Sequence, residues 1–354
     1  MQQSLTEIFQ QQILLATDEG TPLRIIGSDS KQFLGTPCNS RRLKAGGHRG
    51  IIEYEPSELV IRARSGTPLR EIQRTLAERR QQLAFEPPAF GDDATLGGTI
   101  ACNLSGPARP YAGAARDHLL GARIINGKGE ILRFGGEVIK NVAGYDASRL
   151  MCGAFGTLGL LLDVSLKVVP LEETQVTLTQ DMDSDQALQT MTRLGRSALP
   201  INALAHYDNR LYIRLAGNEH GVLGAQRQLG GEPLHNAADF WLALNEQQLA
   251  FFQNNDAPLW RVSLPFNRPS LELDGQWLLD WAGAQRWLRS HTPAEQIRQQ
   301  AANHGGHASL WRGGHAQDSR FTPLPAALLH LHQRLKQAFD PAGIFNPGRL
   351  YTEQ

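Results

Sequence analysis

Cysteine is scarce in this chain of 354 residues, which contains only Cys38, Cys102 and Cys152 and no CxxC pair. This spacing excludes a zinc ribbon and an iron–sulfur cluster built from this chain alone, and a sparse, odd count is typical of a reducing cytoplasm. Net charge is lacking too, because 35 basic residues balance 35 acidic ones. That balance gives no support to nucleic-acid binding, which favours a basic surface.

Long apolar runs are also missing, and none could span a bilayer. The N-terminal stretch has no basic residues before an apolar core, so we do not interpret it as a secretory signal. Leu5, Ile8, Phe9 and Leu15 instead predict an amphipathic helix over residues 3–17. We therefore expect a cytoplasmic protein, which other subunits would have to bring to any membrane.

Two common nucleotide motifs are absent. The chain has no GxxxxGK[ST], which excludes a P-loop. The glycines of GAFGTLG (153–159) are spaced by three and precede a strand, whereas the GxGxxG turn of a Rossmann fold opens a helix. The sequence thus argues against a nicotinamide dehydrogenase of the usual type.

Glycine is abundant in the first half, beginning with GSDSK (27–31) after the strand predicted for PLRII (22–26). Successive backbone N–H groups in such a turn bind anions, and serine hydroxyls add donors. Lys31 could add positive charge. Asp29 would repel a phosphate unless it points away or meets a ribose hydroxyl. The segment predicts a phosphate site, although a turn without ligand has the same composition.

Three further Gly-rich segments follow, at 86–113, 140–159 and 340–351. We predict the first of them to be a long Ω-type loop, a kind of loop that is usually functional in a compact domain. A local excess of basic residues, RRLKAGGHR at 41–49, is interpreted as a solvated turn or as positive potential near a bound anion or an acidic partner.

Short strands and helices alternate up to residue 170. Thr67 and Pro68 predict the N-cap and first position of a helix over 69–82, and Asn126-Gly127 predicts a hairpin over 122–136. After residue 170 the pattern indicates an antiparallel sheet with helices on one face. All six tryptophans lie there, either in its core or on a docking surface. A helix is predicted over 324–339.

Taken in order, six motifs resemble the FAD-linked oxidases of the vanillyl-alcohol oxidase / p-cresol methylhydroxylase (PCMH-type) family. They are GSDSK (27–31), TLGG (95–98), RDHLLG (116–121), KNVAGYD (140–146), GAFGTLG (153–159) and DPAGIFNPG (340–348). The resemblance implies an α+β fold, in which a PCMH-type FAD-binding domain of two α+β subdomains (1–170) is followed by an antiparallel α+β cap domain (171–320). Residues 321–354 would return to the FAD domain.

The resemblance also implies the residues that hold FAD. The pyrophosphate would lie against Gly27, Ser28, Asp29, Ser30 and Lys31. The ribityl chain and ring would meet Pro87, Thr95, Gly97, Gly98, Ser105 and Tyr111, and the adenine side would meet Gly156, Leu158 and Gly159. Some relatives bind flavin covalently through a histidine of the pyrophosphate loop. Because residues 27–31 contain no histidine, we expect non-covalent FAD.

Within the family, the chain is most similar to FAD-binding subunits of complexes that oxidise glycolate, a 2-hydroxy acid, to glyoxylate. The implied partners are a larger homologous FAD subunit and an iron–sulfur subunit that passes electrons to a respiratory acceptor, with this chain peripheral at the inner membrane and little active alone. Two alternatives stay open. One is a non-catalytic assembly subunit with an idle or degenerate FAD site, and the other is a stand-alone FAD-dependent alcohol or hydroxy-acid oxidase.

The chain departs from the family in its cap, where hydroxy-acid dehydrogenases resemble one another in a His-rich metal motif. Here His304, His307 and His315 are not spaced one helical turn apart, and no Glu or Asp lies among them before Asp318. We expect no metal, interpret them as loop histidines, and keep His307 as a catalytic candidate because its pKa suits acid–base work. Arg109 and Arg349 are candidate carboxylate ligands or structural ion pairs.

Overall fold

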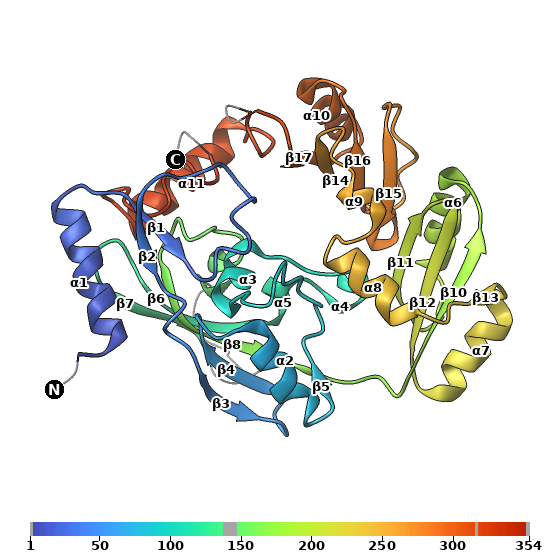
Figure 1. Cartoon of the computed structure of the whole chain (residues 1–354), viewed down its shortest axis with the longest axis horizontal. Coiled ribbons are helices and arrows are strands. Elements are labelled where there is room, and N and C mark those ends of the chain that lie inside the picture. Colours follow the sequence, from blue (N-terminus) through green and yellow to red (C-terminus); the bar gives the residue numbers. More distant parts are fainter. Residues whose placement is uncertain (1–2, 137–146, 316–317, 352–354) are drawn as a thin grey trace.

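The computed structural model describes residues 3–136, 147–315 and 318–351, so the predicted KNVAGYD motif lies outside the described residues. Figure 1 shows the chain arranged around two separate sheets, with the first half of the sequence and the C-terminal helix on one side and residues 174–312 on the other. Both sheets are mixed with helices, so the α+β fold class predicted from the sequence is confirmed.

The first sheet has five antiparallel strands in the order β3-β4-β8-β6-β7. They span Ile51–Glu55 (β3), Val60–Arg64 (β4), Leu160–Lys167 (β8), Leu119–Ile125 (β6) and Ile131–Gly135 (β7). Its apolar core includes the inner faces of α2 (Leu69–Ala77) and α3 (Leu96–Cys102). Several short elements complete this layer. They are the helices α4 (Arg109–Ala112) and α5 (Ala115–His118), the strand pair β5 (Gln81–Gln82) and β9 (Val169–Pro170), and the 3-10 helix η1 (Ala147–Met151).

A smaller unit lies beside this sheet. Helix α1 (Leu5–Asp18) begins at a capping box of Ser4 and Glu7, which confirms the helix predicted for 3–17. It packs against the parallel pair β1 (Leu23–Ile26) and β2 (Arg41–Lys44). The C-terminal segment joins the same core, because α11 (Ala326–Phe339) leads to a bridge between Leu23 and Phe345. The two ends of the chain are therefore packed together.

The second sheet has eight antiparallel strands in the order β13-β10-β12-β11-β15-β16-β14-β17. They span Glu232–Pro233 (β13), Thr174–Asp181 (β10), Arg210–Gly217 (β12), Ile201–Tyr207 (β11), Gln276–Asp280 (β15), Gln285–Arg289 (β16), Leu259–Ser263 (β14) and His307–Arg312 (β17). The 3-10 turn η2 (Trp281–Gly283) joins β15 to β16. Asp208 and Asn209 both have positive φ at the hairpin turn between β11 and β12, as a type I′ turn requires.

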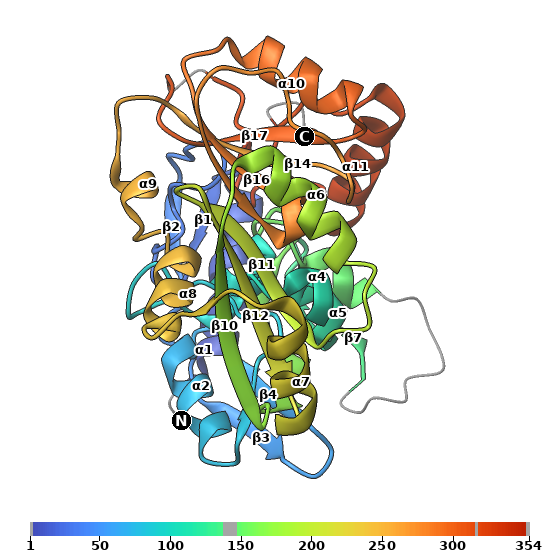
Figure 2. The same cartoon turned by 90° about the vertical axis from the view of Figure 1, so that its right-hand side faces the viewer.

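Both faces of the second sheet are covered, whereas the sequence predicted helices on one face. Helices α6 (Ser184–Leu194), α7 (Glu219–Leu229) and α10 (Ala294–Asn303) pack on one face. The other face packs against α8 (Ala237–Asn245), α9 (Ala250–Gln253) and the first half of the chain (Figure 2). Five of the six tryptophans are buried, and Trp277 is partly buried, so they are core residues rather than an exposed docking surface.

Some local predictions were wrong, for identifiable reasons. Thr67 does not cap α2, because its hydroxyl bonds to the backbone of Gly50 instead, and Pro68 precedes the helix rather than opening it. The predicted Ω-loop at 86–113 contains α3 and α4, and Arg41–Lys44 is a strand rather than a turn.

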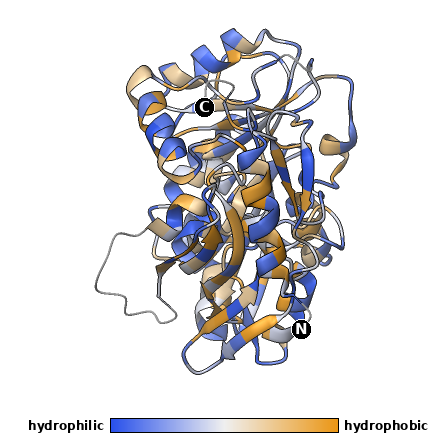
Figure 3. Cartoon of the chain, turned by 90° about the vertical axis from the view of Figure 1, so that its left-hand side faces the viewer, coloured by the Kyte–Doolittle hydropathy of each residue, from blue (hydrophilic) through white to orange (hydrophobic). Residues whose placement is uncertain are grey.

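No helix in the described part of the chain is both long enough and apolar enough to cross a bilayer. Outer helices instead alternate between hydrophobic and hydrophilic residues along their length, as Figure 3 shows. In α11 the predicted apolar face is only partly used. Leu335 and Phe339 pack against the first core, while Leu328 and Leu331 remain about half exposed.

Candidate functional site

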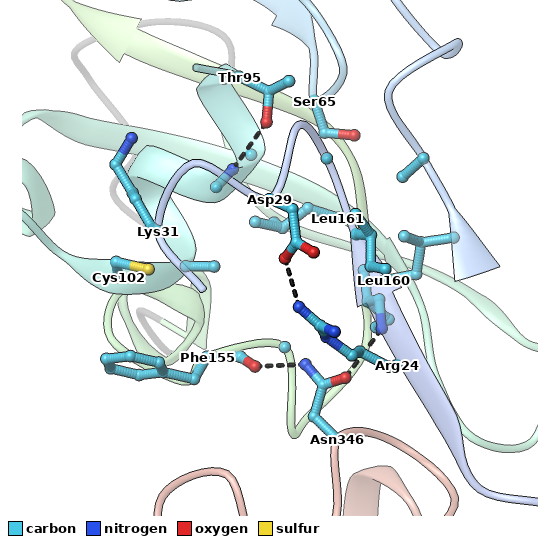
Figure 4. Close-up of a pocket in the computed structure, with 18 of the residues that line it drawn as sticks. Arg24, Asp29, Lys31, Ser65, Thr95, Cys102, Phe155, Leu160, Leu161 and Asn346 are labelled. Atoms are coloured by element: carbon cyan, nitrogen blue, oxygen red, sulfur yellow. Dashed lines mark hydrogen bonds and ion pairs between the residues drawn. The ribbon is translucent and has the colours of Figure 1, made fainter. Parts of the chain in front are cut away.

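A cavity opens at the carboxyl end of β1, between the 27–32 loop, α3 and the segment before β8 (Figure 4). Its walls come from elements far apart in the sequence, including the C-terminal segment. The predicted cofactor residues that line it are Gly27, Ser28, Asp29, Ser30, Lys31, Thr95, Gly97, Gly98, Gly156 and Gly159. The fold therefore brings three of the Gly-rich motifs and the C-terminal motif to one cavity.

The 27–31 loop presents unpaired backbone donors to this cavity. Within the described residues, the amide N–H groups of residues 28–31 have no hydrogen-bond acceptor. Asp29 has a φ of 66°, a left-handed conformation that makes the backbone N–H groups of such a turn converge. Its carboxylate forms an ion pair with Arg24 at 2.5 Å. That pairing offsets the repulsion between Asp29 and a phosphate, which was the sequence-based reason to suspect a degenerate site.

Two glycines keep the cavity open by lacking a side chain. A Cβ on Gly27 would lie 2.3 Å from Oγ1 of Thr95, and one on Gly97 would lie 2.7 Å from Cβ of Ser65. Thr95 itself caps α3 by accepting a bond from the amide of Gly98. Oγ of Ser65 is buried without a partner in the described structure. The converging backbone amides and the unpaired hydroxyl of Ser65 are hydrogen-bond donors, and the glycines leave room for a ligand to lie against the backbone. These features fit the diphosphate of a dinucleotide.

Asn346 is a site residue that the sequence reasoning did not single out. Its Oδ1 accepts from the amide of Ile25 at 2.8 Å and its Nδ2 donates to the carbonyl of Phe155 at 2.5 Å, so it joins β1 to the 154–161 wall (Figure 4). The NPG motif was noted as Gly-rich, but its asparagine carried no local signal, because both partners lie far away in the sequence.

Lys31 and Arg349 hold the loop rather than pointing free charge into the cavity. Nζ of Lys31 donates to the carbonyl of Ala89 at 3.0 Å, and burial lowers the pKa of Lys31. The guanidinium of Arg349 donates to the carbonyls of Gln32 and Thr36, and burial lowers its pKa as well. Arg349 therefore holds residues 32–36, next to the predicted phosphate loop, by hydrogen bonds. Because its guanidinium nitrogens are engaged there, they are not free to bind a substrate carboxylate.

The remaining predicted residues lie elsewhere. Leu158 is in the core of the first sheet, and Pro87 lines a separate hollow between α2 and α8. Ser105 lines a second, smaller cavity that faces the eight-stranded sheet, where its hydroxyl accepts from the amide of Ala115. Tyr111, on α4, is 37% exposed. Arg109 stacks over the ring of Trp281, at 4.3 Å from its centroid.

The three histidines of the 304–315 stretch do not converge. His304 bonds to the carbonyl of Gln300, while His307 lies on β17. His307 is exposed as a whole residue, but partial burial of its ring, and next the charge of Arg261, lower its pKa. Across the described residues, no three metal-ligating side chains come together.

The burial of Asp280 predicts that the free energy of unfolding depends on pH. Asp280 is 4% exposed, and its burial raises its pKa from 3.8 to about 7. Because the folded pKa lies above the unfolded one, the native state holds the proton more tightly, and the free energy of unfolding falls as pH rises from about 4 to about 7.

We expect Asp280→Asn to flatten this dependence by roughly 2–3 kcal/mol between pH 5 and pH 8, at 1.36 kcal/mol per unit of pKa shift. Urea unfolding of both proteins at the two pH values measures the difference. The comparison cancels other titrating groups, since both proteins share them. Parallel pH profiles would show that Asp280 keeps an ordinary pKa.

Comparison with known protein families agrees with this geometry. Residues 6–135 match the FAD binding domain model, and residues 285–350 match the model of the C-terminal domain of FAD-linked oxidases. The first match covers the cavity loop and α3, and the second covers Asn346 and Arg349. The chain belongs to the family of FAD-linked oxidases, and it is an FAD-dependent oxidoreductase.

Among individual proteins, the chain is 48% identical to the glycolate oxidase subunit GlcE of Escherichia coli K12, over 97% of this chain and 96% of that protein. It is 33% identical to the glycolate oxidase subunit GlcD of Bacillus subtilis 168, over 40% of this chain and 30% of that protein. A solved structure of alkyldihydroxyacetonephosphate synthase superposes with a TM-score of 0.63 at 13% identity, covering 96% of this chain and 75% of the other, which shows a shared fold.

Proposed function

We propose that this chain is the FAD-carrying subunit of a complex that oxidises glycolate, or a close 2-hydroxy acid, to the 2-oxo acid glyoxylate. The observation that carries the proposal is 48% identity to a glycolate oxidase subunit along almost the whole of both chains. The 27–31 loop supports it independently, because its unpaired amides and the Arg24–Asp29 pair suit an intact FAD site rather than a degenerate one.

The protein's part in the reaction is binding and orientation. FAD, when bound, accepts the hydride that leaves the carbon bearing the hydroxyl group. The amides of residues 28–31 would hold the diphosphate, and Thr95, Gly97 and Gly98 would hold the ribityl chain and ring. Because Arg349 and Asn346 fix the loop from the C-terminal segment, the cofactor's position depends on both ends of the chain. The 27–31 loop contains no histidine, and Cys102, which lines the cavity, stays a thiol because burial raises its pKa to about 11, so we propose that FAD is bound without a covalent bond.

Electrons have to leave through other proteins in this proposal. A chain with three cysteines cannot supply the four thiolates of an iron–sulfur cluster. We therefore propose an iron–sulfur partner and a larger FAD subunit homologous to this chain. The similarity to GlcD covers 40% of this chain, which supports such a homologous pair. Through these partners the chain would be a cytoplasmic protein held peripherally at the inner membrane.

The proposal is tested by the visible spectrum of the purified chain. We expect flavin absorption bands that pass into the supernatant when the protein is denatured. Anaerobic glycolate should bleach these bands when the partner subunits are present, and only weakly with the chain alone. A protein that purifies without flavin, and gains none in the complex, would contradict FAD binding. Fast bleaching by the chain alone would favour a stand-alone oxidase.

A further inference from the structure

The face of the eight-stranded sheet that packs toward the FAD domain carries three linked polar side chains. Arg261 (β14), Gln285 (β16) and Asp280 (β15) share this face because of the strand register. Nε of Arg261 donates to Oε1 of Gln285 at 2.6 Å, and Nε2 of Gln285 donates to Oδ2 of Asp280 at 3.0 Å. Gln285 thus joins a cation to a carboxylate, and fixes the direction of both.

Two guanidinium groups lie near the ring of Trp281, and neither contacts a carboxylate directly in the described structure. Arg261 lies 4.9 Å, and Arg109 4.3 Å, from the ring centroid of Trp281. Neither forms an ion pair within the described residues, and the terminal nitrogens of Arg261 make no hydrogen bond there. Burial, and next the charge of Arg109, lower the pKa of Arg261 to about 10, which leaves it charged at neutral pH. Two partly buried like charges repel each other, and a bound anion would relieve that repulsion.

Trp281, which both arginines contact, is held in an unusual conformation. Its φ is 51° and that of Ala282 is 54°, both in the left-handed region that bulky residues avoid. Its Nε1 is buried without a hydrogen-bond partner in the described structure. Strained backbone and unpaired buried donors persist where the surroundings hold them in place, and they gather at functional sites.

Arg261, Gln285 and Asp280 line a small cavity between the sheet and the 88–106 segment, whereas Arg109 and Trp281 lie outside its lining. Trp287 and Trp311 form apolar walls, and Ser105 and Gly106 form the opposite side. The same segment continues back into α3, which lines the FAD cavity, so the two cavities are neighbours along one short stretch of chain.

We propose that this cavity binds a small 2-hydroxy carboxylate, with the free nitrogens of Arg261 holding the carboxylate. A guanidinium fork matches a carboxylate, and its Nε bond to Gln285 already orients it. Asp280 supplies an acceptor for a hydroxyl on the neighbouring carbon. The tryptophan walls restrict the remaining chain to a few atoms. The inference deepens the proposed function, on which it rests for the choice of glycolate as probe.

The test is calorimetric titration of the FAD-loaded full-length chain with glycolate, and with neutral glycolamide. We expect glycolate to bind and glycolamide not to. Arg261→Gln should raise the Kd for glycolate at least tenfold, since it removes the fork. Arg312→Gln is the matched control. It removes another cation of this sheet, one that stacks on Phe33 and does not line the cavity, so the Kd should stay within twofold.

Thermal melting checks that each variant folds. If Arg261→Gln does not fold, Arg261→Lys decides the question, because it keeps the charge and removes the fork, with an expected rise in Kd of at least threefold. Absence of glycolate binding to the native chain, or a folded Arg261→Gln or Arg261→Lys that binds as the native chain does, would overturn the inference.

The outcomes also separate this inference from the proposed function. If the complex oxidises glycolate and the Arg261→Gln chain binds glycolate as the native chain does, the proposed function holds and the proposed site is wrong. Glycolate binding that requires Arg261, in a chain whose complex fails to oxidise glycolate, leaves the site standing and removes the proposed function.

Discussion

Gly27→Val should weaken FAD binding by about a hundredfold, or on the order of 3 kcal/mol, the upper end of the cost of overpacking. The reason is space, because even a Cβ at this position would lie 2.3 Å from Oγ1 of Thr95. Gly27 does not have a positive φ, so the substitution adds no backbone strain of the left-handed kind. Either the loop moves away from α3 or Thr95 leaves its cap, and both disturb the anion-binding amides.

Fluorescence titration of the flavin-free protein with FAD measures this effect. Gly224→Ala is the control, since nothing lies within 4 Å of the added Cβ and the residue is inside α7. It should leave FAD affinity unchanged and stabilise the helix by roughly 0.5–1 kcal/mol. Equal affinity in Gly27→Val and the native chain would mean that the 27–31 loop does not hold the cofactor.

Lys336→Met should destabilise the protein by about 3–5 kcal/mol, the usual loss when one partner of a buried ion pair is removed. Nζ of Lys336 donates to Asp340 at 2.7 Å and to the carbonyls of Thr157 and Phe345 at 2.8 Å. Asp340 is 1% exposed, so the substitution leaves a buried carboxylate without its cation. Urea unfolding gives the free energy directly.

Arg334→Ala, an exposed change on the same helix, should cost no more than about 0.5 kcal/mol. The double variant Lys336→Met with Asp340→Asn should recover part of the loss, because no unpaired charge remains. Since Lys336 anchors the segment that carries Asn346 and Arg349, the single variant should also retain less flavin on purification. A loss below about 1 kcal/mol would show that the pair is hydrated and dispensable.

The parts of this site that are local in sequence could be predicted. GSDSK after a strand is a short-range pattern, and the loop lies where that pattern predicts it. Thr67 shows where local reasoning fails, because its hydroxyl found a partner at Gly50, seventeen positions away. The role of Asn346 could not be predicted from the sequence, because its two hydrogen-bond partners are 321 and 191 positions away.

The cavity of the second sheet illustrates the same limit. Arg261, Asp280 and Gln285 belong to three strands, and only their register places them on one face. A shift of one residue in any of these strands would turn its side chain to the opposite face. The sequence shows which residue types are present, but only the pairing of the strands shows that these three side chains are neighbours.

The return of the C-terminal segment to β1 sets an order of events during synthesis. The bridge between Leu23 and Phe345, and the hydrogen bonds of Arg349 to residues 32–36, join the first strand to residues that are translated much later. A nascent chain on the ribosome therefore exposes the 27–31 loop long before Arg349 can hold it. Stable capture of FAD has to wait for that late segment, and a chain shortened by premature termination before residue 344 should emerge without flavin.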